Sequence, residues 1–320
     1  AGAVGGVVGA RLHQHGYEVA LVARGAHHDA IRDGGLHLEA PDESVTLPLP
    51  VHASPVDVDF RDGDVVLVAV KSQDTIGVLD ALGEVMPFDT PIVCLQNGVA
   101  NERMALRRFP NVYAVCVVLP AVHLEPGVVV ANAAPITGIL DVGREPSGID
   151  DTATAVAGAF SSSTFSSEAR ADVMRWKYRK LLNNLVNALD ALVGREQRGE
   201  GIDGLTTRVR DEGAAVLAAA GIDYVSPEED AARRGELFQW RGPASGARQG
   251  SSSWQSLARG TGAIESDYLN GEIVLLGRLH GVPTPVNAAL QRLANEAARR
   301  GVAPGATPAA VVIQAIEQGE

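Results

Sequence analysis

The chain has little cysteine and few aromatic residues. Only two of its 320 residues are cysteines, Cys94 and Cys116, and both lie in apolar stretches that are typical of buried strands. Two such thiols exclude the disulfide framework of a small secreted domain and favour a reducing, cytoplasmic location. Aromatic residues make up 4% of the chain. We therefore expect cores that are packed mainly with Ala, Val and Leu.

Basic residues and long apolar runs are also scarce. The chain has 27 Lys and Arg against 39 Asp and Glu, which gives a formal net charge of −12. This charge repels polyphosphate backbones and anionic lipid headgroups, and no run of Lys and Arg offsets it. The longest strand-like apolar run, residues 65–70, is far shorter than the roughly 20 residues that span a bilayer. We therefore expect a soluble protein that binds neither nucleic acid nor membrane. We assign no metal ligands and expect no signal peptide.

The first half of the chain has the pattern of an α/β domain. Up to about Ser167, short Val/Ile/Leu runs alternate with helix-like segments, which is typical of parallel strands buried on both faces of a sheet. The predicted strands are residues 18–23, 65–70, 92–95 and 112–118. Residues 127–130 and 137–140 are expected to form an antiparallel pair that closes the sheet edge.

The second half has the pattern of an all-helical domain. From Asp172 onward the strand signal disappears and apolar residues recur with a helical period. Three predicted helix starts and one stop are Ser226-Pro227-Glu228-Glu229, Thr284-Pro285, Thr307-Pro308 and Gly281. The Gly/Ser-rich residues 242–253 predict a loop. At 320 residues the chain is long enough for two domains, each with its own core.

The first residues are typical of the second half of a dinucleotide-binding fingerprint. In the segment Ala1-Gly2-Ala3-Val4-Gly5-Gly6, Gly2 would let the backbone approach a pyrophosphate and Gly5 would let the helix pack on the sheet. The first glycine and first strand of the fingerprint would precede residue 1, and we expect truncation of the chain rather than natural loss. A glycine-rich helix start serves plain packing about as often as cofactor binding.

Two cations follow predicted strands. About 20 residues after the glycines, a NAD site carries an acidic residue on the ribose hydroxyls, whereas this chain has Arg24. An arginine there pairs with a 2′-phosphate, which favours NADP(H) over NAD(H). Lys71 follows another strand at its carboxyl end and is a second candidate phosphate contact. Each cation could instead be a solvated surface residue, but their joint placement at strand ends disfavours this alternative.

Four segments together resemble the ketopantoate reductase (2-dehydropantoate 2-reductase) family. They are Val70-Lys71-Ser72-Gln73, Leu95-Gln96-Asn97-Gly98, residues 176–187 and Glu265-Ser266-Asp267-Tyr268-Leu269-Asn270-Gly271. The resemblance implies an NADP-binding Rossmann-like domain over residues 1–168, an all-helical substrate domain over residues 169–320, and an active site in the cleft between them. It also implies NADPH-dependent reduction of 2-dehydropantoate, or of a related 2-oxo acid, in pantothenate biosynthesis.

The resemblance assigns a general acid to the first long helix of the second domain. The corresponding lysine is Lys180, and asparagines that bind substrate correspond to Asn184 and Asn187 at i+4 and i+7 on the same helical face. The family's usual steps of four would instead give Arg179, Asn183 and Asn187. We prefer Lys180 because an arginine is a poor proton donor near neutral pH. The asparagines could also simply bond to loops across the domain interface.

Three further substrate contacts are implied by the resemblance. Glu265 corresponds to a glutamate that binds the substrate hydroxyl, and Ser252 corresponds to a serine that holds the carboxylate. Asn97 corresponds to an asparagine near the nicotinamide, so we assign it to both substrate and cofactor. Ser252 lies in a triple serine where the match can shift by one residue, and Glu265 could be a solvated helix residue. Asn97 could form a simple turn with Gly98.

Other functions stay open at this point. A non-catalytic NADPH-binding sensor would account for the absent first strand of the sheet. A dehydrogenase of phosphorylated or sugar acids is disfavoured, because it needs clustered cations in the second domain and only scattered ones such as Arg208 and Arg210 occur. The oligomeric state is not fixed by the sequence, and a homodimer is compatible with it.

Overall fold

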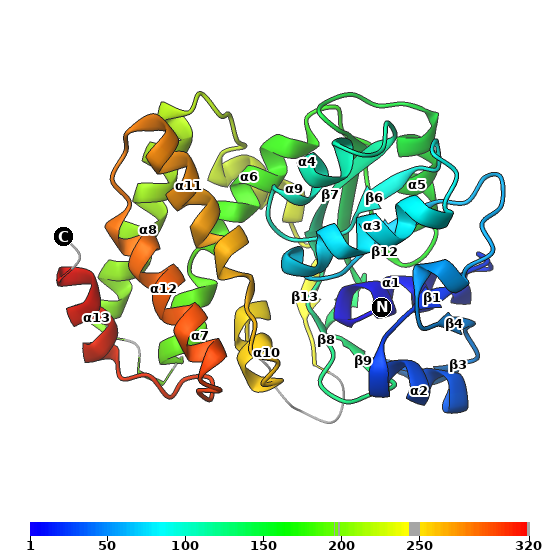
Figure 1. Ribbon diagram of the computed structural model, residues 1–320, viewed down its shortest axis with the longest axis horizontal. Helices are drawn as coiled ribbons and strands as arrows, with labels where there is room; N and C mark the ends of the chain where they lie inside the picture. Colours follow the sequence, from blue (N-terminus) through cyan, green and yellow to red (C-terminus); the bar gives the residue numbers. More distant parts are fainter. Residues whose placement is uncertain (195, 198, 243–249, 319–320) are drawn as a thin grey trace. The chain divides into compact units, whose positions relative to one another are not determined.

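The computed structural model describes residues 1–194, 196–197, 199–242 and 250–318, and the chain forms two compact units (Figure 1). The first unit comprises Ala1–Lys177 and Ser226–Arg248, and the second comprises Tyr178–Val225 and Gln249–Glu320. The first is α/β and the second is helical, which confirms the predicted fold class. The compact units divide the chain after Lys177, whereas the boundary that we expect from the sequence between functional domains follows residue 168.

A five-stranded sheet forms the centre of the first unit. Its strands are β5 (Val66–Val68), β6 (Ile92–Cys94), β7 (Val112–Val118), β11 (Gly138–Arg144) and β12 (Phe165–Ser166), in the order β12-β11-β7-β6-β5. Strands β5, β6 and β7 run parallel, and β11 lies antiparallel to β7. The carboxyl ends of β5 and β6 therefore meet at one edge, where the loops that carry Lys71 and Asn97 begin.

Helices cover both faces of this sheet (Figure 1). Because successive strand residues point to opposite faces, Ile92 and Cys94 pack in one apolar cluster, whereas Val93 and Leu95 pack in another. The helices of the first cluster are α3 (Thr75–Val85) and α4 (Asn101–Leu106), and those of the second include α1 (Ala3–Gln14) and α5 (Asp151–Ser161). Each large apolar side chain buried in this way stabilises the fold by about 1.5–3 kcal/mol.

The predicted antiparallel pairing of residues 127–130 with 137–140 is wrong. Strand β9 (Val128–Ala131) pairs in parallel with β2 (Leu36–Ala40) in a second sheet of order β3-β2-β9-β8, while β11 pairs with β7. Six of the seven residues of β11 are buried, so β11 needs a neighbour on each side rather than an edge position. The strands not yet described are β1 (Leu21–Val22), β3 (Glu43–Leu47), β4 (Val51–His52), β8 (Ala121–Val122), β10 (Ala133–Pro135) and β13 (Phe238–Trp240).

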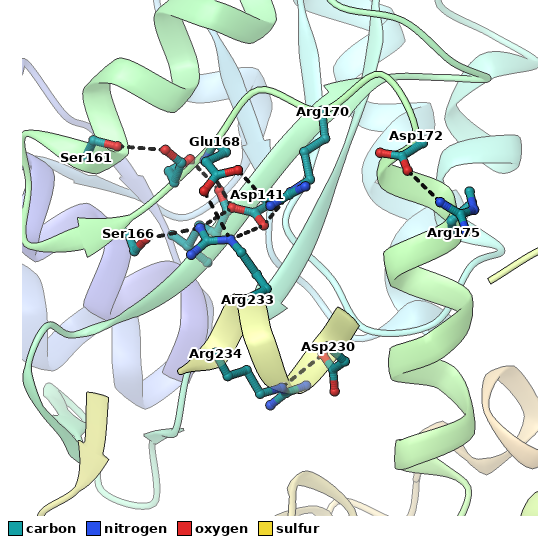
Figure 2. A network of polar contacts seen from close by, with 12 residues as sticks. Asp141, Ser161, Ser166, Glu168, Arg170, Asp172, Arg175, Asp230, Arg233 and Arg234 are labelled. Atoms are coloured by element: carbon teal, nitrogen blue, oxygen red, sulfur yellow. Dashed lines mark hydrogen bonds and ion pairs between the residues drawn. The ribbon is translucent and has the colours of Figure 1, made fainter. Parts of the chain in front are cut away.

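Residues 226–240 return to the first unit through α9 (Pro227–Arg234) and β13. The predicted capping box is confirmed, because Ser226 Oγ accepts from the Glu229 backbone N at 3.1 Å and Glu229 Oε2 accepts from the Ser226 backbone N at 2.8 Å. Asp141, only 2% exposed, accepts hydrogen bonds from Arg170 and Arg233 (Figure 2). This buried carboxylate therefore fixes α9 to strand β11.

The second unit consists of packed helices that follow predicted boundaries closely. Helix α11 ends at Gly281, whose φ of +70° favours glycine, and α12 starts after Thr284 with proline in its first turn, as predicted. Helix α13 has Pro308 as its N-cap, one residue later than expected. The helices are α7 (Asn187–Val193), α8 (Glu200–Ala219), α10 (Ser252–Ala258), α11 (Asn270–His280), α12 (Pro285–Arg299) and α13 (Ala309–Glu317), together with the later part of α6 (Val173–Asn184).

Two further expectations concern the helical part. Of the predicted loop at residues 242–253, residues 243–249 lie outside the described residues, and α10 already begins at Ser252. Among the helices that the structure describes, none combines the length and the apolar character required to cross a membrane.

Candidate functional site

The glycines at the start of α1 have different surroundings. Gly2 precedes the helix in extended conformation, and a Cβ added there would meet no described atom within 4 Å. A Cβ at Gly5 would lie 2.9 Å from the Cβ of Ala69, which is closer than real Cβ atoms approach. Gly5 therefore permits the helix to pack against the chain beyond β5. Packing against the described residues therefore does not require glycine at position 2.

The two predicted cations lie on neighbouring loops of the first unit. Arg24 is the N-cap residue of α2 (Gly25–Gly34), and its side chain is 73% exposed. It forms an ion pair at 3.5 Å with Asp74, which belongs to the short 3₁₀ helix η2 (Ser72–Asp74) directly after Lys71. The structure therefore brings the Arg24 and Lys71 loops together, as a shared ligand site would need.

A buried polar network joins the loop after β5 to the loop after β6. Gln96 Nε2 donates to the backbone carbonyl of Val70 at 2.8 Å and to Thr75 Oγ1 at 2.9 Å. Thr75 Oγ1 in turn donates to Asn101 Oδ1 at 2.8 Å. Gln96, Thr75 and Asn101 are all buried. Because buried polar groups are costly when unpaired, these bonds hold the two loops in one arrangement.

Asn101 extends this network to Asn97. Its Nδ2 donates to the backbone carbonyl of Asn97 at 3.0 Å and to Ser72 Oγ at 3.1 Å. Asn97 is half-buried, and Gly98 follows it with a φ of +77°, a conformation that favours glycine. The chain thus bends at Asn97 and Gly98, shortly after β6 ends at Cys94. Ser72 and Asn97 are tied to one another through a single buried amide.

The sequence reasoning missed a buried ion pair beneath this loop. Lys177 Nζ lies 2.8 Å from Glu102 Oε1, and the side chains of the two residues are 2% and 0% exposed. The same ammonium donates to the backbone carbonyls of Gln96 at 2.8 Å and Val115 at 3.1 Å. One signal was available in the sequence: Lys177 precedes Lys180 by three residues and so lies on the same face of α6.

Two titratable groups near this ion pair have shifted pKa values. Burial, together with the negative charge of Glu102, raises the pKa of Glu145 to about 7, while Lys177 opposes both effects. Burial also raises the pKa of the Cys94 thiol well above its usual value. Cys94 is therefore a protonated, buried thiol and not a nucleophile at neutral pH.

The predicted helical face of the second unit is interrupted. Helix α6 ends at Asn184 and α7 begins at Asn187. The prediction of one continuous helix that carries Lys180, Asn184 and Asn187 is therefore wrong. Lys180 and Asn184 still share a face of α6 at i and i+4. These two residues and Asn187 are half-buried. The position of Asn187 depends on the break between the helices.

The break is stabilised by a residue of the fourth matched segment. The backbone carbonyl of Leu185 accepts from Asn270 Nδ2 at 2.9 Å, and the same amide donates to Asn287 Oδ1 at 3.0 Å. Asn287 Nδ2 donates to Glu212 Oε2 at 2.8 Å, and both Asn270 and Asn287 are 0% exposed. Asn270 therefore fixes the chain between Asn184 and Asn187.

Glu265 is a buried residue and not a solvated helix residue. It is 4% exposed and begins the 3₁₀ helix η3 (Glu265–Tyr268). Arg259 lies close enough to Glu265 for the two charges to interact. Burial lowers the pKa of Arg259, and the negative charge of Glu265 opposes this shift. The alternative of an ordinary solvated position is thus wrong. Arg259 was also missed from the sequence, where an isolated arginine carries no signal of its own.

The triple serine has three different environments. Ser251 is the N-cap of α10 and accepts from the Trp254 backbone N at 3.3 Å. Ser253 is 3% exposed, whereas Ser252 is half-buried at the start of the helix. Ser251 thus acts as a helix cap and Ser253 is buried, while the assignment of Ser252 to the substrate carboxylate stays a prediction.

The predicted site residues divide between the two units. Gly2, Gly5, Arg24, Lys71 and Asn97 belong to the first unit, and Lys180, Asn184, Asn187, Ser252 and Glu265 belong to the second. Within the first unit, contacts join the loops of Arg24, Lys71 and Asn97. Within the second, Lys180 and Asn184 share one helical face.

Comparison with known proteins matches both parts of the chain to one family. Residues 1–144 match the family described as ketopantoate reductase PanE/ApbA, and residues 172–298 match the C-terminal part of the same family. The 2-dehydropantoate 2-reductase of Archaeoglobus fulgidus is 30% identical over 300 residues, which cover 92% of this chain and 94% of that protein. The protein of the same name from Pyrococcus horikoshii is 27% identical over 299 residues and has the same coverage.

Solved structures agree with this match. A PanE/ApbA family ketopantoate reductase from Ralstonia eutropha aligns with a TM-score of 0.78 and 31% identity over 94% of this chain and 97% of that chain. A D-mandelate dehydrogenase in complex with NADH and anilino(oxo)acetate aligns with a TM-score of 0.77 over 94% of this chain and 97% of that chain. At 24% identity, the dehydrogenase shows a shared fold alone. The chain therefore belongs to the ketopantoate reductase family.

Proposed function

We propose that this protein is an NADPH-dependent reductase of a small 2-oxo acid, with 2-dehydropantoate as the first candidate substrate. The observation that carries the proposal is the arrangement at the edge of the first unit. There, an open glycine start of α1 occurs together with Arg24 and Lys71 on adjoining loops, in a chain whose family is ketopantoate reductase. The corresponding cellular role is a step of pantothenate biosynthesis.

The residues present fit a cofactor with an added phosphate. The Arg24 guanidinium is exposed, and its ion pair with Asp74 is long and solvated, so a dianionic 2′-phosphate can compete for it. Lys71 and the first amides of α1 would bind the remaining phosphates. Asn97 would contact the nicotinamide end. The D-mandelate dehydrogenase structure contains NADH, so a comparison of NADPH with NADH is part of any test.

When bound, the cofactor supplies a hydride for the C2 carbonyl of the substrate. We assign the proton to Lys180, which would donate it to the forming alkoxide oxygen. Asn184 and Asn187 would orient the substrate, and Ser252 would donate a hydrogen bond to its carboxylate. Glu265 would accept a hydrogen bond from the primary hydroxyl. As a buried acceptor, Glu265 would discriminate against substrates that leave it unpaired.

In this proposal, residues 1–168 bind the cofactor, and residues 169–320 bind the substrate and transfer the proton. The alternative function is that of a non-catalytic NADPH sensor. The oligomeric state is a separate question, and light scattering would show whether the chain forms a homodimer. The decisive experiment follows NADPH oxidation by absorbance with a panel of 2-oxo acids. We expect the highest kcat/KM with 2-dehydropantoate. Tight NADPH binding without turnover of any 2-oxo acid would support the sensor instead.

A further inference from the structure

Lys177 is held by one ion pair and by hydrogen bonds to two backbone carbonyls. Its ammonium has three N–H groups, and three acceptors surround it: Glu102 Oε1 at 2.8 Å, the Gln96 carbonyl at 2.8 Å and the Val115 carbonyl at 3.1 Å. With a side chain that is 2% exposed, it also has little access to water. A lysine that must exchange protons with a substrate needs an open donor position. Lys177 is therefore built to hold other groups in place.

The groups that Lys177 holds belong to the loop that carries Asn97. Its bond to the Gln96 carbonyl fixes the peptide between Gln96 and Asn97, and its bond to Val115 anchors that peptide to the neighbouring strand β7. Glu102, at the start of α4, supplies the counter-charge that makes a buried ammonium tolerable.

The side chain of Gln96 transmits this restraint to a second loop. It donates to the Val70 carbonyl and to Thr75, and Asn101 links Ser72 to the Asn97 carbonyl. A shift of the Gln96 peptide would therefore move both the turn at Asn97 and the chain around Lys71. These bonds join the two loops through buried side chains, so the loops should move together.

We infer that Lys177 and Glu102 are positioning residues, which set the loops of Asn97 and Lys71 in the conformation that binds the cofactor. This inference rests on the proposed function only in taking those loops as the cofactor contacts. The pair acts through the backbone of Gln96 and touches neither substrate nor cofactor. Its loss should affect the binding and orientation of NADPH beyond any general loss of stability.

The test uses a charge-neutral double variant, Lys177→Met with Glu102→Gln. The single Lys177→Met variant would leave the carboxylate of Glu102 buried without a counterion and can fail to fold, which the double variant avoids. The matched control is Asp141→Asn, which weakens another buried carboxylate–arginine cluster of the same unit, whose bonds run to Glu168, Arg170 and Arg233 (Figure 2). All variants are compared in the full chain by thermal unfolding.

Two measurements on these proteins decide the inference. In the double variant, we expect amide hydrogen exchange to lose protection in residues 95–101, and we expect the Kd for NADPH to rise about 10- to 100-fold. The control, even with a similar loss of Tm, should keep both properties within about two-fold of the unmodified chain. Unchanged protection of residues 95–101, or equal changes in the double variant and the control, would overturn the inference.

The outcome is separable from that of the proposed function. If the unmodified chain binds NADPH but reduces no 2-oxo acid, the proposed reductase fails, while exchange and NADPH affinity still decide the role of Lys177. If it reduces 2-dehydropantoate and the double variant keeps the same Kd and kcat, the reductase stands and the positioning role is wrong. A fall in kcat at saturating NADPH, in the double variant alone, would support a role in orienting the bound cofactor.

Discussion

The two units bury polar groups in different ways. In the first, two buried charge clusters stand out: Lys177 pairs with Glu102, and Asp141 pairs with two arginines. In the second, the central contacts at the helix break come from the neutral amides of Asn270 and Asn287, which bond to backbone, to one another and to the carboxylate of Glu212. Buried charges respond to pH and to the loss of one partner, whereas neutral amides do not titrate. The stability of the first unit should therefore depend on pH more than that of the second.

The same comparison extends to function. We assign cofactor affinity to the first unit and proton transfer to the second, so variants in the two units should change different kinetic constants. Five measurements, from the largest expected effect to the smallest, would separate the two units further or show that the separation is wrong.

The largest effect is expected for Lys180→Ala in the second unit. Loss of a general acid typically lowers the rate 10²–10⁴-fold, so kcat should fall by about that factor while the Kd for NADPH stays nearly constant. Arg179→Ala is the matched control and should be mild. Steady-state kinetics and a separate titration of NADPH measure both constants. If Arg179→Ala abolishes turnover and Lys180→Ala keeps most of it, the register is wrong by one residue, and Asn183 replaces Asn184.

A change in the first unit should instead act on the cofactor. Arg24→Asp should weaken NADPH binding by about 1.5–3 kcal/mol, which is the scale of a charged hydrogen bond. Asp74→Asn removes the carboxylate that competes for Arg24 and should strengthen NADPH binding slightly. Titration of each variant with NADPH and NADH checks the preference. Equal affinities of the unmodified chain for the two cofactors would contradict the role of Arg24.

Substrate selectivity should depend on Glu265. Glu265→Ala should lower kcat/KM for 2-dehydropantoate by about 10-fold more than for an analogue without the hydroxyl, because only the former loses a partner. Arg259 lies near Glu265, so Arg259→Leu shows how much of the change reflects charge in this part of the unit. Equal losses for the two substrates would make Glu265 a structural group.

Local signals in the sequence predicted much of the fold. The capping box at Ser226 and the stop at Gly281 follow from short-range rules, and both occur in the structure. The pairing of residues 127–130 was wrong because an apolar run shows that a strand is buried but not which neighbour it takes. The same limit explains why the pair of Lys177 and Glu102 was missed: its members lie far apart in the sequence and meet only in the folded chain.

The contribution of a buried, uncharged amide to the stability of the second unit can be tested at Asn270. Asn270→Ala leaves the Leu185 carbonyl without this donor, and the free energy of unfolding should fall by about 1–3 kcal/mol. Because an amide does not titrate, the loss should be the same at pH 5 and pH 8. Denaturant unfolding at both pH values measures it. A loss that varies strongly with pH would show that titratable groups control this part of the second unit as well.

In the first unit, the buried carboxyl group of Glu145 should instead make the free energy of unfolding depend on pH. Burial, assisted by the charge of Glu102, raises the pKa of Glu145 from the usual 4.5 to about 7. Between these values the folded chain keeps a proton that the unfolded chain has lost. The contribution to stability is therefore complete below about pH 4.5 and disappears as the pH rises through 7.

Glu145→Gln should remove this dependence and stabilise the protein at pH 8 by about 2 kcal/mol relative to its effect at pH 4.5. His27 acts in the opposite direction, because burial lowers its pKa to about 4 and its contribution is lost as the pH falls from 6.5. The difference between the unmodified chain and Glu145→Gln, measured by denaturant unfolding across this range, cancels the His27 contribution. A difference that stays constant with pH would mean that Glu145 has no raised pKa, and the contrast between the two units would lose its titratable basis.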